Sequence, residues 1–159
     1  MKAEEIIELL SLKPLSFEGG FFYETYRSPG KLETGAGMRN FSTAIYYLLR
    51  EGEKSRIHRL KSDEVFHFYL GNPVEMFLFK EDGSCEKKIL GAELQNGEEP
   101  QILIPAGCWQ GAKLREGGKF ALMGTTVSLG FDEADFEAGA RENLVSAYPS
   151  HKEIIDLLT

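Results

Sequence analysis

The chain has 159 residues, of which 27% are charged and 42% hydrophobic, and its formal net charge is −7. This composition suits one domain over residues 1–159 and excludes a disordered or fibrous chain. The acidic balance, without a basic stripe, argues against nucleic acid as the main partner. No apolar run approaches the roughly 20 residues that a membrane span needs, so no membrane partner is expected either.

Both ends of the sequence predict short helices. Residues Ala3–Leu10 place apolar side chains at helical spacing between glutamates, and a similar pattern follows Ser150. A signal peptide would need basic residues and a continuous apolar stretch, so the expected location is cytoplasmic. The cysteines, Cys85 and Cys108, lack CxxC spacing. We therefore expect reduced thiols and no disulfide framework.

Between the helices, the sequence predicts nine short strands separated by turn residues. The gaps are too short for the crossover helices that parallel strands require. We therefore predict an all-β sandwich or barrel. A polar stretch after the last strand, Phe131–Tyr148, is expected to wrap the barrel or to pack on a partner. The predicted strands are Phe21–Arg27, Phe41–Leu49, Arg56–Leu60, Glu64–Leu70, Val74–Lys80, Glu86–Leu90, Gln101–Ile104, Trp109–Leu114 and Phe120–Val127.

One segment of the strand region resembles the first signature of the cupin superfamily, G-x5-H-x-H-x3-E-x6-G. Four residues fall at the family's spacing, and Leu60 replaces the second histidine. The matching residues are Gly52, His58, Glu64 and Gly71.

A second segment, PAGCWQ, resembles the other cupin signature, P-x-G-x2-H-x3-N. Pro105 and Gly107 match, whereas Gln110 replaces the histidine and Leu114 the asparagine. More narrowly, FEGGFFYETYRS, FSTAIYYLL, HRLKSDEVFHFYLG, IPAGCWQ and VSLGFDEADFE are similar to the Cupin_5 (DUF985) family over roughly residues 15–137. The resemblance implies a double-stranded β-helix (a cupin jelly-roll barrel) with short N- and C-terminal helices.

Strand alternation gives these motif residues a predicted placement. Arg56, His58 and Leu60 share one side of a strand, because side chains alternate between faces. If the turn that follows keeps Glu64 on the inner side, His58 and Glu64 approach each other inside the barrel. The same alternation turns His67 away from Glu64, unless a bulge resets it.

Acid/base chemistry is one function that this cluster predicts. Burial would raise the pKa of Glu64, and His58 would act as its catalytic partner. Such a pair can move a proton next to a carbonyl, as in the epimerases and isomerases of the cupin superfamily, here on a sugar or nucleotide-like compound. Arg56 would hold a phosphate or carboxylate, Tyr46 or Tyr47 would donate a proton, and Trp109 would offer an apolar face.

Two further functions use the same residues. A non-catalytic ligand-binding or sensor protein would recognise a small molecule with the polar and aromatic side chains alone. A weak metal-dependent enzyme would hold a divalent metal with His58, Glu64 and Gln110, although Leu60 removes one of the family's ligands. A purely structural His58–Glu64 pair stays open as well. The candidate ligand-binding residues are Tyr46, Arg56, His67, Trp109 and Gln110.

The pattern of apolar residues also predicts a homodimer. Segments Phe21–Tyr26 and Phe41–Leu49 carry apolar or aromatic residues on both faces, and only one face can fill the barrel. The terminal helices can cover part of the other face. A second subunit is the simplest cover for the rest, and the cupins that this chain resembles commonly dimerise.

Overall fold

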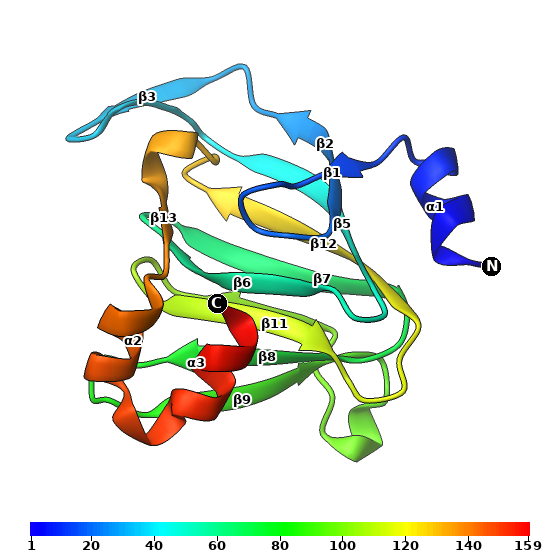
Figure 1. Ribbon diagram of the computed structural model, residues 1–159. Coiled ribbons are helices and arrows are strands. Elements are labelled where there is room, and N and C mark those ends of the chain that lie inside the picture. The colour runs from blue at the N-terminus through cyan, green and yellow to red at the C-terminus, as the bar shows by residue number, and fades with distance from the viewer.

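The computed structural model describes residues 1–159 (Figure 1). All nine predicted strands are present, with ends within two residues of those predicted, and four short strands are added. The helices are α1 (Ala3–Leu9), α2 (Arg141–Ala147) and α3 (Lys152–Leu158), with 3₁₀ turns η1 (Leu94–Asn96), η2 (Glu133–Asp135) and η3 (Pro149–His151). The strands are β1 (Lys13–Pro14), β2 (Phe21–Arg27), β3 (Lys31–Thr34), β4 (Gly37–Asn40), β5 (Thr43–Arg50), β6 (Lys54–Leu60), β7 (Asp63–Gly71), β8 (Val74–Phe79), β9 (Cys85–Leu90), β10 (Gln101–Ile104), β11 (Trp109–Leu114), β12 (Phe120–Ser128) and β13 (Phe136–Ala138).

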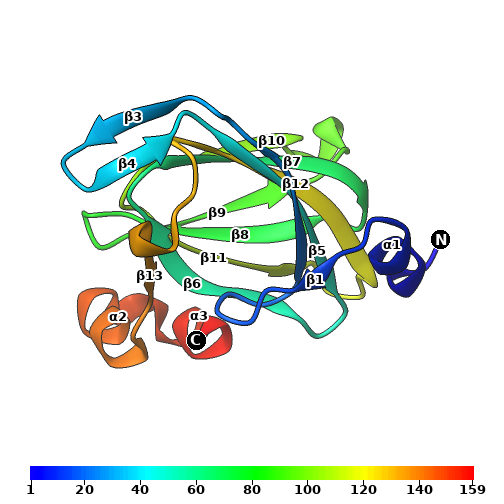
Figure 2. The same ribbon diagram turned by 90° about the horizontal axis from the view of Figure 1, so that it is seen from above.

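Two antiparallel sheets face each other and form a jelly-roll barrel (Figures 1 and 2). The six-stranded sheet has the order β1-β2-β5-β12-β7-β10, and the five-stranded sheet has the order β13-β6-β11-β8-β9. Strands β3 and β4 form a separate hairpin that extends beyond the barrel (Figure 2). The predicted all-β jelly roll with short terminal helices is therefore confirmed.

The apolar core fills only one end of the barrel. On β5, Tyr47 and Leu49 point between the sheets and are almost fully buried, as is Met123 on the paired strand β12. Thr43 and Ile45, at the start of β5, instead line a cavity. The same inward face of the sheet is thus packed solid at one end and hollow at the other.

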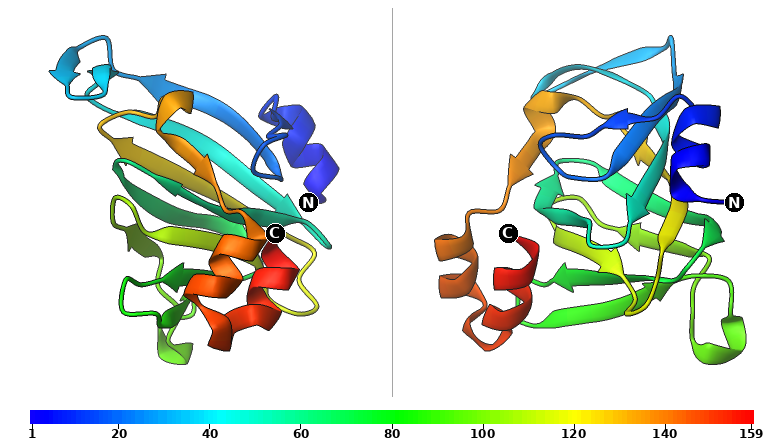
Figure 3. Two further views of the ribbon diagram at one scale, coloured as in Figure 1. Left: turned by 60° about the vertical axis from the view of Figure 1, so that its left-hand side comes forward. Right: turned by 45° about the vertical axis from the view of Figure 1, so that its right-hand side comes forward.

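The helices cover parts of the two outer faces (Figure 3). Helix α1 packs its apolar side over Leu48 and Leu122 of the six-stranded sheet. Helices α2 and α3 cover Ile57, Phe77 and Phe79 of the five-stranded sheet. None of the helices has both the length and the apolar character that crossing a lipid bilayer requires.

The segment Phe131–Tyr148 wraps the barrel, which was one of its two expected roles. It forms turn η2, then strand β13, then helix α2. Strand β13 adds an edge to the five-stranded sheet by pairing Phe136 with Leu60 and Ala138 with His58. The chain therefore returns from the six-stranded sheet to the five-stranded sheet beside the cavity.

Both cysteines are free thiols, as predicted, and both are half-buried. Burial raises the pKa of Cys85 to about 11, and the nearby Cys108 adds to this shift. Burial also raises the pKa of Cys108. Both shifts favour the unreactive thiol form over the thiolate.

Candidate functional site

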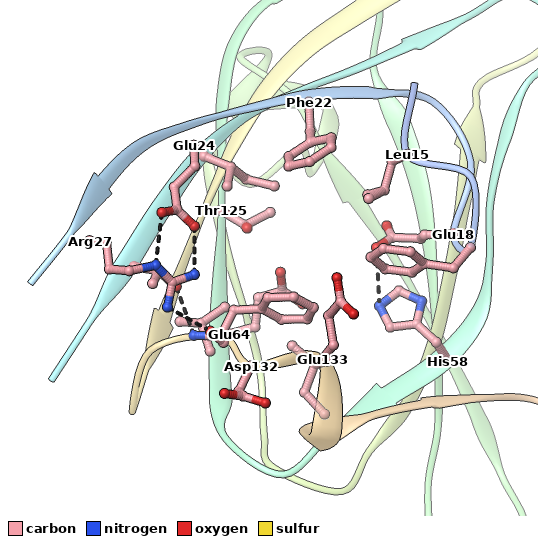
Figure 4. Close-up of a pocket in the computed structure, with 16 residues that line it drawn as sticks. Leu15, Glu18, Phe22, Glu24, Arg27, His58, Glu64, Thr125, Asp132 and Glu133 are labelled. Carbon is pink, nitrogen blue, oxygen red and sulfur yellow. Dashed lines mark hydrogen bonds and ion pairs between the residues drawn. The ribbon is translucent and has the colours of Figure 1, made fainter. Parts of the chain in front are cut away.

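A cavity of about 470 Å³ opens between the two sheets at the hollow end of the barrel (Figure 4). Its wall combines apolar side chains with several carboxylates. Strands from both sheets contribute, together with the loop before β2 and the segment after β12. The lining residues are Leu15, Phe17, Glu18, Phe22, Glu24, Arg27, Thr43, Ile45, His58, Leu60, Glu64, Thr125, Val127, Phe131, Asp132 and Glu133.

His58 is held in one orientation on β6. Its Nδ1 lies 2.8 Å from the Arg56 carbonyl oxygen, and its ring stacks on Phe136 with centroids 5.1 Å apart. Because a carbonyl oxygen only accepts hydrogen bonds, Nδ1 carries the proton of the neutral ring. The lone pair is then on Nε2, which lies 3.8 Å from Oε2 of Glu18. His58 can accept a proton at Nε2, and the resulting imidazolium would face a carboxylate.

Glu64 is a buried carboxyl group on β7, with 6% of its surface exposed. Its Oε2 accepts a hydrogen bond of 2.7 Å from Nε2 of Gln110. Burial raises the pKa of Glu64, and the negative charge of Glu18 raises it further. His58, Gln110 and Thr125 oppose this shift without reversing it. Glu64 therefore keeps its proton to a higher pH than an ordinary glutamate does.

Gln110 links the two sheets across the barrel. It is 2% exposed, and on β11 it pairs in register with His58 of β6, within the five-stranded sheet. Its amide reaches Glu64, which belongs to the six-stranded sheet. The replacement of the family's histidine by Gln110 thus fixes the orientation of the Glu64 carboxylate.

Glu18 completes the polar cluster, and sequence reasoning missed it. It lies in the loop between β1 and β2, where its Oε1 accepts a hydrogen bond of 2.7 Å from Ser55. The loop is fixed by the Tyr47 hydroxyl, which donates to the Gly19 carbonyl at 3.0 Å. The only signal in the sequence is an acidic residue directly before two glycines, in the segment FEGG.

The mouth of the cavity carries a paired arginine. A bulge in β2 between Glu24 and Tyr26 brings Glu24 and Arg27 to one side of the strand. Nε and Nη2 of Arg27 donate to the two carboxylate oxygens of Glu24 at 2.8 and 2.7 Å. Alternation in an unbulged strand would place these residues on opposite faces, so the bulge is what makes the pair.

A buried ion pair anchors one wall of this mouth. Arg39 of β4 donates from Nε and Nη2 to the two carboxylate oxygens of Asp135, at 2.6 and 2.9 Å. Asp135 ends turn η2, and Asp132 and Glu133, at the start of the same turn, line the cavity. The hairpin outside the barrel therefore fixes the segment that closes the cavity on one side.

The expected direct contact between His58 and Glu64 is absent. Both line the cavity, but β6 and β7 belong to different sheets, so the two side chains face each other across the barrel. The ion-pair partner of His58 is Glu18, and the hydrogen-bond partner of Glu64 is Gln110. The turn between the strands crosses from sheet to sheet, which the sequence pattern does not reveal.

The predicted placement of Arg56 in the cavity is wrong. The β6–β11 register shifts between the Gln110–His58 and Ala112–Ser55 pairs. This bulge breaks the alternation on which the prediction depended, and it turns Arg56 outward. Its exposed guanidinium donates to the Ser16 carbonyl at 2.5 Å.

Three further candidate residues lie on outer faces of the barrel. Tyr46 stacks edge-on against Tyr69, with ring centroids 6.0 Å apart. Trp109 lies under the Arg59 guanidinium, 4.4 Å from the ring centroid, and packs beside the C-terminal helices. His67 bonds to Thr126 and Gln101 at 3.0 Å, facing away from Glu64 as alternation predicts. None of the three lines the cavity.

The residues at the cupin metal position do not fit a tightly held metal ion. Leu60 offers no donor atom and Gln110 donates its amide to Glu64, which leaves His58 and carboxylates. No three side chains of His, Cys, Asp or Glu converge in an arrangement that could hold a metal. A single imidazole with carboxylates is a poor set for zinc, iron, nickel or copper.

Comparison with known proteins places these features in a family. The family model Cupin_5, described as "Cupin superfamily (DUF985)", matches residues 4–139. The solved structure of protein SO0799 from Shewanella oneidensis is 36% identical and superposes with a TM-score of 0.92, covering 100% of this chain and 98% of that one. A hypothetical protein from Leishmania major is 28% identical, with a TM-score of 0.93 and coverage of 100% and 99%.

The uncharacterized protein YML079W of Saccharomyces cerevisiae is 30% identical over 132 residues, which are 74% of this chain and 66% of the yeast protein. Two more distant solved structures share the fold alone. A cupin 2 conserved barrel domain protein from Rhodopseudomonas palustris shares 13% identity at a TM-score of 0.60, with coverage of 88% and 79%. Oxalate decarboxylase from Bacillus subtilis shares 16% at a TM-score of 0.53, with coverage of 87% and 38%.

Proposed function

The chain belongs to the Cupin_5 (DUF985) family of the cupin superfamily, and we propose that it binds an organic small molecule in the cavity between its two sheets. One observation carries the proposal: His58, Glu64 and Glu18 line a hollow of about 470 Å³ together with seven apolar side chains and several further polar ones. Ligand sites in proteins have this size and this mixture of an apolar wall with a few polar groups.

Acid/base catalysis is the chemistry that we propose for this site. Nε2 of His58 and the carboxyl group of Glu64 come from opposite sheets, so a bound carbonyl compound would have a group on each side. His58 would take a proton from the carbon next to the carbonyl, leaving an enolate. Glu64, whose raised pKa favours the protonated acid, would return a proton at the other face. One proton leaves and one proton returns on the opposite face, so the net reaction is an epimerisation. The carboxylate of Glu18 would stabilise the imidazolium that His58 becomes.

The structure gives no support to the expected binding of a ligand phosphate by Arg56, because Arg56 lies outside the cavity. A nucleotide-like ligand therefore lacks the anchor that the sequence predicted for its phosphate. A ligand-binding or sensor protein without turnover is the second candidate, since the same cavity supports binding by itself. The metal-dependent alternative finds no converging ligand set.

A cavity-filling variant tests the proposed binding. Ile45 of β5 lines the cavity, whereas its neighbour Tyr46 faces the outer side. In a thermal-shift screen of metabolites, a ligand at a hundredfold excess over its Kd should raise the melting temperature of the wild type by roughly 5 °C or more. Ile45→Trp should abolish this shift, because the indole occupies the cavity. Tyr46→Trp should keep it, and an equal loss in both variants would contradict the proposal.

We also propose a homodimer, formed through the part of the six-stranded sheet that α1 leaves open. Three large side chains lie exposed on that outer face: Tyr23, Tyr69 and Leu103, at 45%, 49% and 53%. A two-fold interface would bury them. Two further expectations remain predictions: a single domain over residues 1–159 and a cytoplasmic location.

Solution scattering at micromolar concentration tests this dimer. The wild type should show twice the mass of the chain, and Leu103→Glu should halve it by placing a charge in the interface. Leu94→Glu is the matched control, because Leu94 is 66% exposed on turn η1, outside the sheet. A monomeric wild type would refute the dimer without affecting the cavity.

A further inference from the structure

The cavity lining carries more acidic than basic groups. It holds four carboxylates besides Glu64, the proposed acid, but only two groups that can be positive, Arg27 and His58. Figure 4 shows that the carboxylates are distributed around the hollow and do not gather on one wall. They belong to Glu18, Glu24, Glu64, Asp132 and Glu133.

Arg27 is not free to hold an anionic ligand. Its Nε and Nη2 donate to both oxygens of Glu24, which neutralises its charge. Its Nη1 donates to Oδ1 of Asn40 at 3.1 Å and to the Phe131 carbonyl at 3.0 Å. Four of the five N–H groups of a guanidinium are thus engaged by the protein itself. A phosphate or carboxylate would have to break this network to bind there.

His58 offers no better anchor for an anion. Its Nδ1 is committed to the Arg56 carbonyl, and its Nε2 already faces Glu18 at 3.8 Å. Asp132 has a weaker partner, because it lies 4.0 Å from Arg39. The unbalanced charge that faces the cavity is therefore negative.

The apolar part of the wall adds an independent observation. Phe17, Phe22 and Phe131 line the cavity, and Phe17 is 38% exposed. The rings of Phe17 and Phe131 are parallel, with centroids 6.4 Å apart. The faces of such rings attract organic ammonium groups, and their surface takes up hydrocarbon. A metal cation, by contrast, needs several donor atoms at one point, and no such point exists.

We infer that the cavity selects an organic cation, a molecule with an ammonium group and an apolar portion. The inference rests on the proposed function and narrows it, because it assigns a charge class to the ligand. The carboxylates would compensate the ammonium group, and the phenyl rings would cover its hydrocarbon part. Anionic compounds would meet repulsion without a free counter-charge.

Three probes of similar size but different charge test this inference: 2-phenylethylammonium, 2-phenylethanol and phenylacetate. Each is titrated into ¹⁵N-labelled protein at pH 7.5 and low salt, and amide shifts are followed. The cation should bind at least about tenfold more tightly than the alcohol and should shift amides of residues that line the cavity, with phenylacetate weakest. Added salt should weaken binding of the cation, since part of the attraction is screened.

A matched pair of variants tests whether the carboxylates of the cavity attract the cationic probe. Glu133→Gln removes one lining carboxylate and should weaken binding of the cation about threefold, as expected for an exposed charge at the mouth of the cavity. Glu116→Gln changes the net charge equally but lies exposed and away from the cavity, so affinity should stay unchanged.

Three results would overturn the inference. If the alcohol or phenylacetate binds in the cavity as tightly as the cation, charge selection fails while binding in the cavity stands. If the cation shifts only amides outside the cavity, the carboxylates are not its site. If none of the probes binds up to about 20 mM, the cavity does not select ammonium compounds, and the Ile45→Trp screen decides separately on small-molecule binding.

Discussion

Replacing Glu64 by Gln is expected to lower kcat by a factor of about 10²–10⁴ on a substrate found by the ligand screen, with KM changed only a few fold. An amide at position 64 fills the same space and can still accept a hydrogen bond from Gln110, which now donates to the carboxylate. It cannot hold or return a proton. Steady-state kinetics of the purified variant measure both parameters. Unchanged turnover would exclude Glu64 as the acid and leave the binding-only alternative.

The pH dependence of stability checks the same residue without a substrate. The pKa of Glu64 is raised in the folded state, so the native protein binds this proton more tightly than the unfolded chain. Its contribution to stability is full below the unfolded pKa, near 4.5, and is lost as pH rises through the folded pKa. As pH rises from below the unfolded pKa to above the folded pKa, the free energy of unfolding of the wild type, measured in urea, should fall relative to that of Glu64→Gln. The expected fall is about 1.4 kcal/mol for each unit by which folding raises the pKa. The control variant Glu116→Gln should show the same dependence of the free energy of unfolding on pH as the wild type.

Gly19→Ala is expected to cost about 3 kcal/mol or more in the free energy of unfolding. Gly19 has φ of +118°, and a Cβ there would lie 2.2 Å from the Lys54 carbonyl oxygen. The backbone cannot yield easily, because the Gly19 carbonyl also accepts from Tyr47. The loop would have to shift, and Glu18 would move away from His58. Urea denaturation measures the loss.

Gly117→Ala is the matched control for this loss. Gly117 also has a positive φ, +80°, but a Cβ there meets nothing within 4 Å. Its replacement should cost only the backbone term, about 1 kcal/mol. Equal losses in the two variants would show that the close approach of Gly19 to Lys54 is unimportant.

The strands could be predicted because their chemistry is local. Aromatic and β-branched runs bounded by glycine and proline located all nine, and motif spacing placed His58 and Glu64 on the inner surface. Alternation also turned His67 outward correctly. These inferences need only the two-residue period of a strand and the residues that break it.

The side-chain placements that were predicted wrongly depend on contacts between segments that are distant in the sequence. The bulge at Arg56 arises from the pairing of β6 with β11, which no local pattern reveals. Tyr46 and Tyr47 are adjacent and equally apolar, so the sequence does not show which one faces inward. Neighbouring Trp109 and Gln110 cannot both point into the barrel, and only Gln110 does. Glu18 reaches the site through a loop, where side-chain direction follows no period.

The anchoring of turn η2 by Arg39 and Asp135 has a consequence for the order in which the site is assembled during synthesis. One wall of the cavity comes from residues 131–133, whereas the loop with Glu18 leaves the ribosome more than a hundred residues earlier. A nascent chain that stops before Phe131 lacks this wall, and one that stops before Asp135 still lacks the charge that secures the wall to the hairpin. The pocket can therefore close only late in translation, and a ligand would find its complete binding surface only in a nearly finished chain.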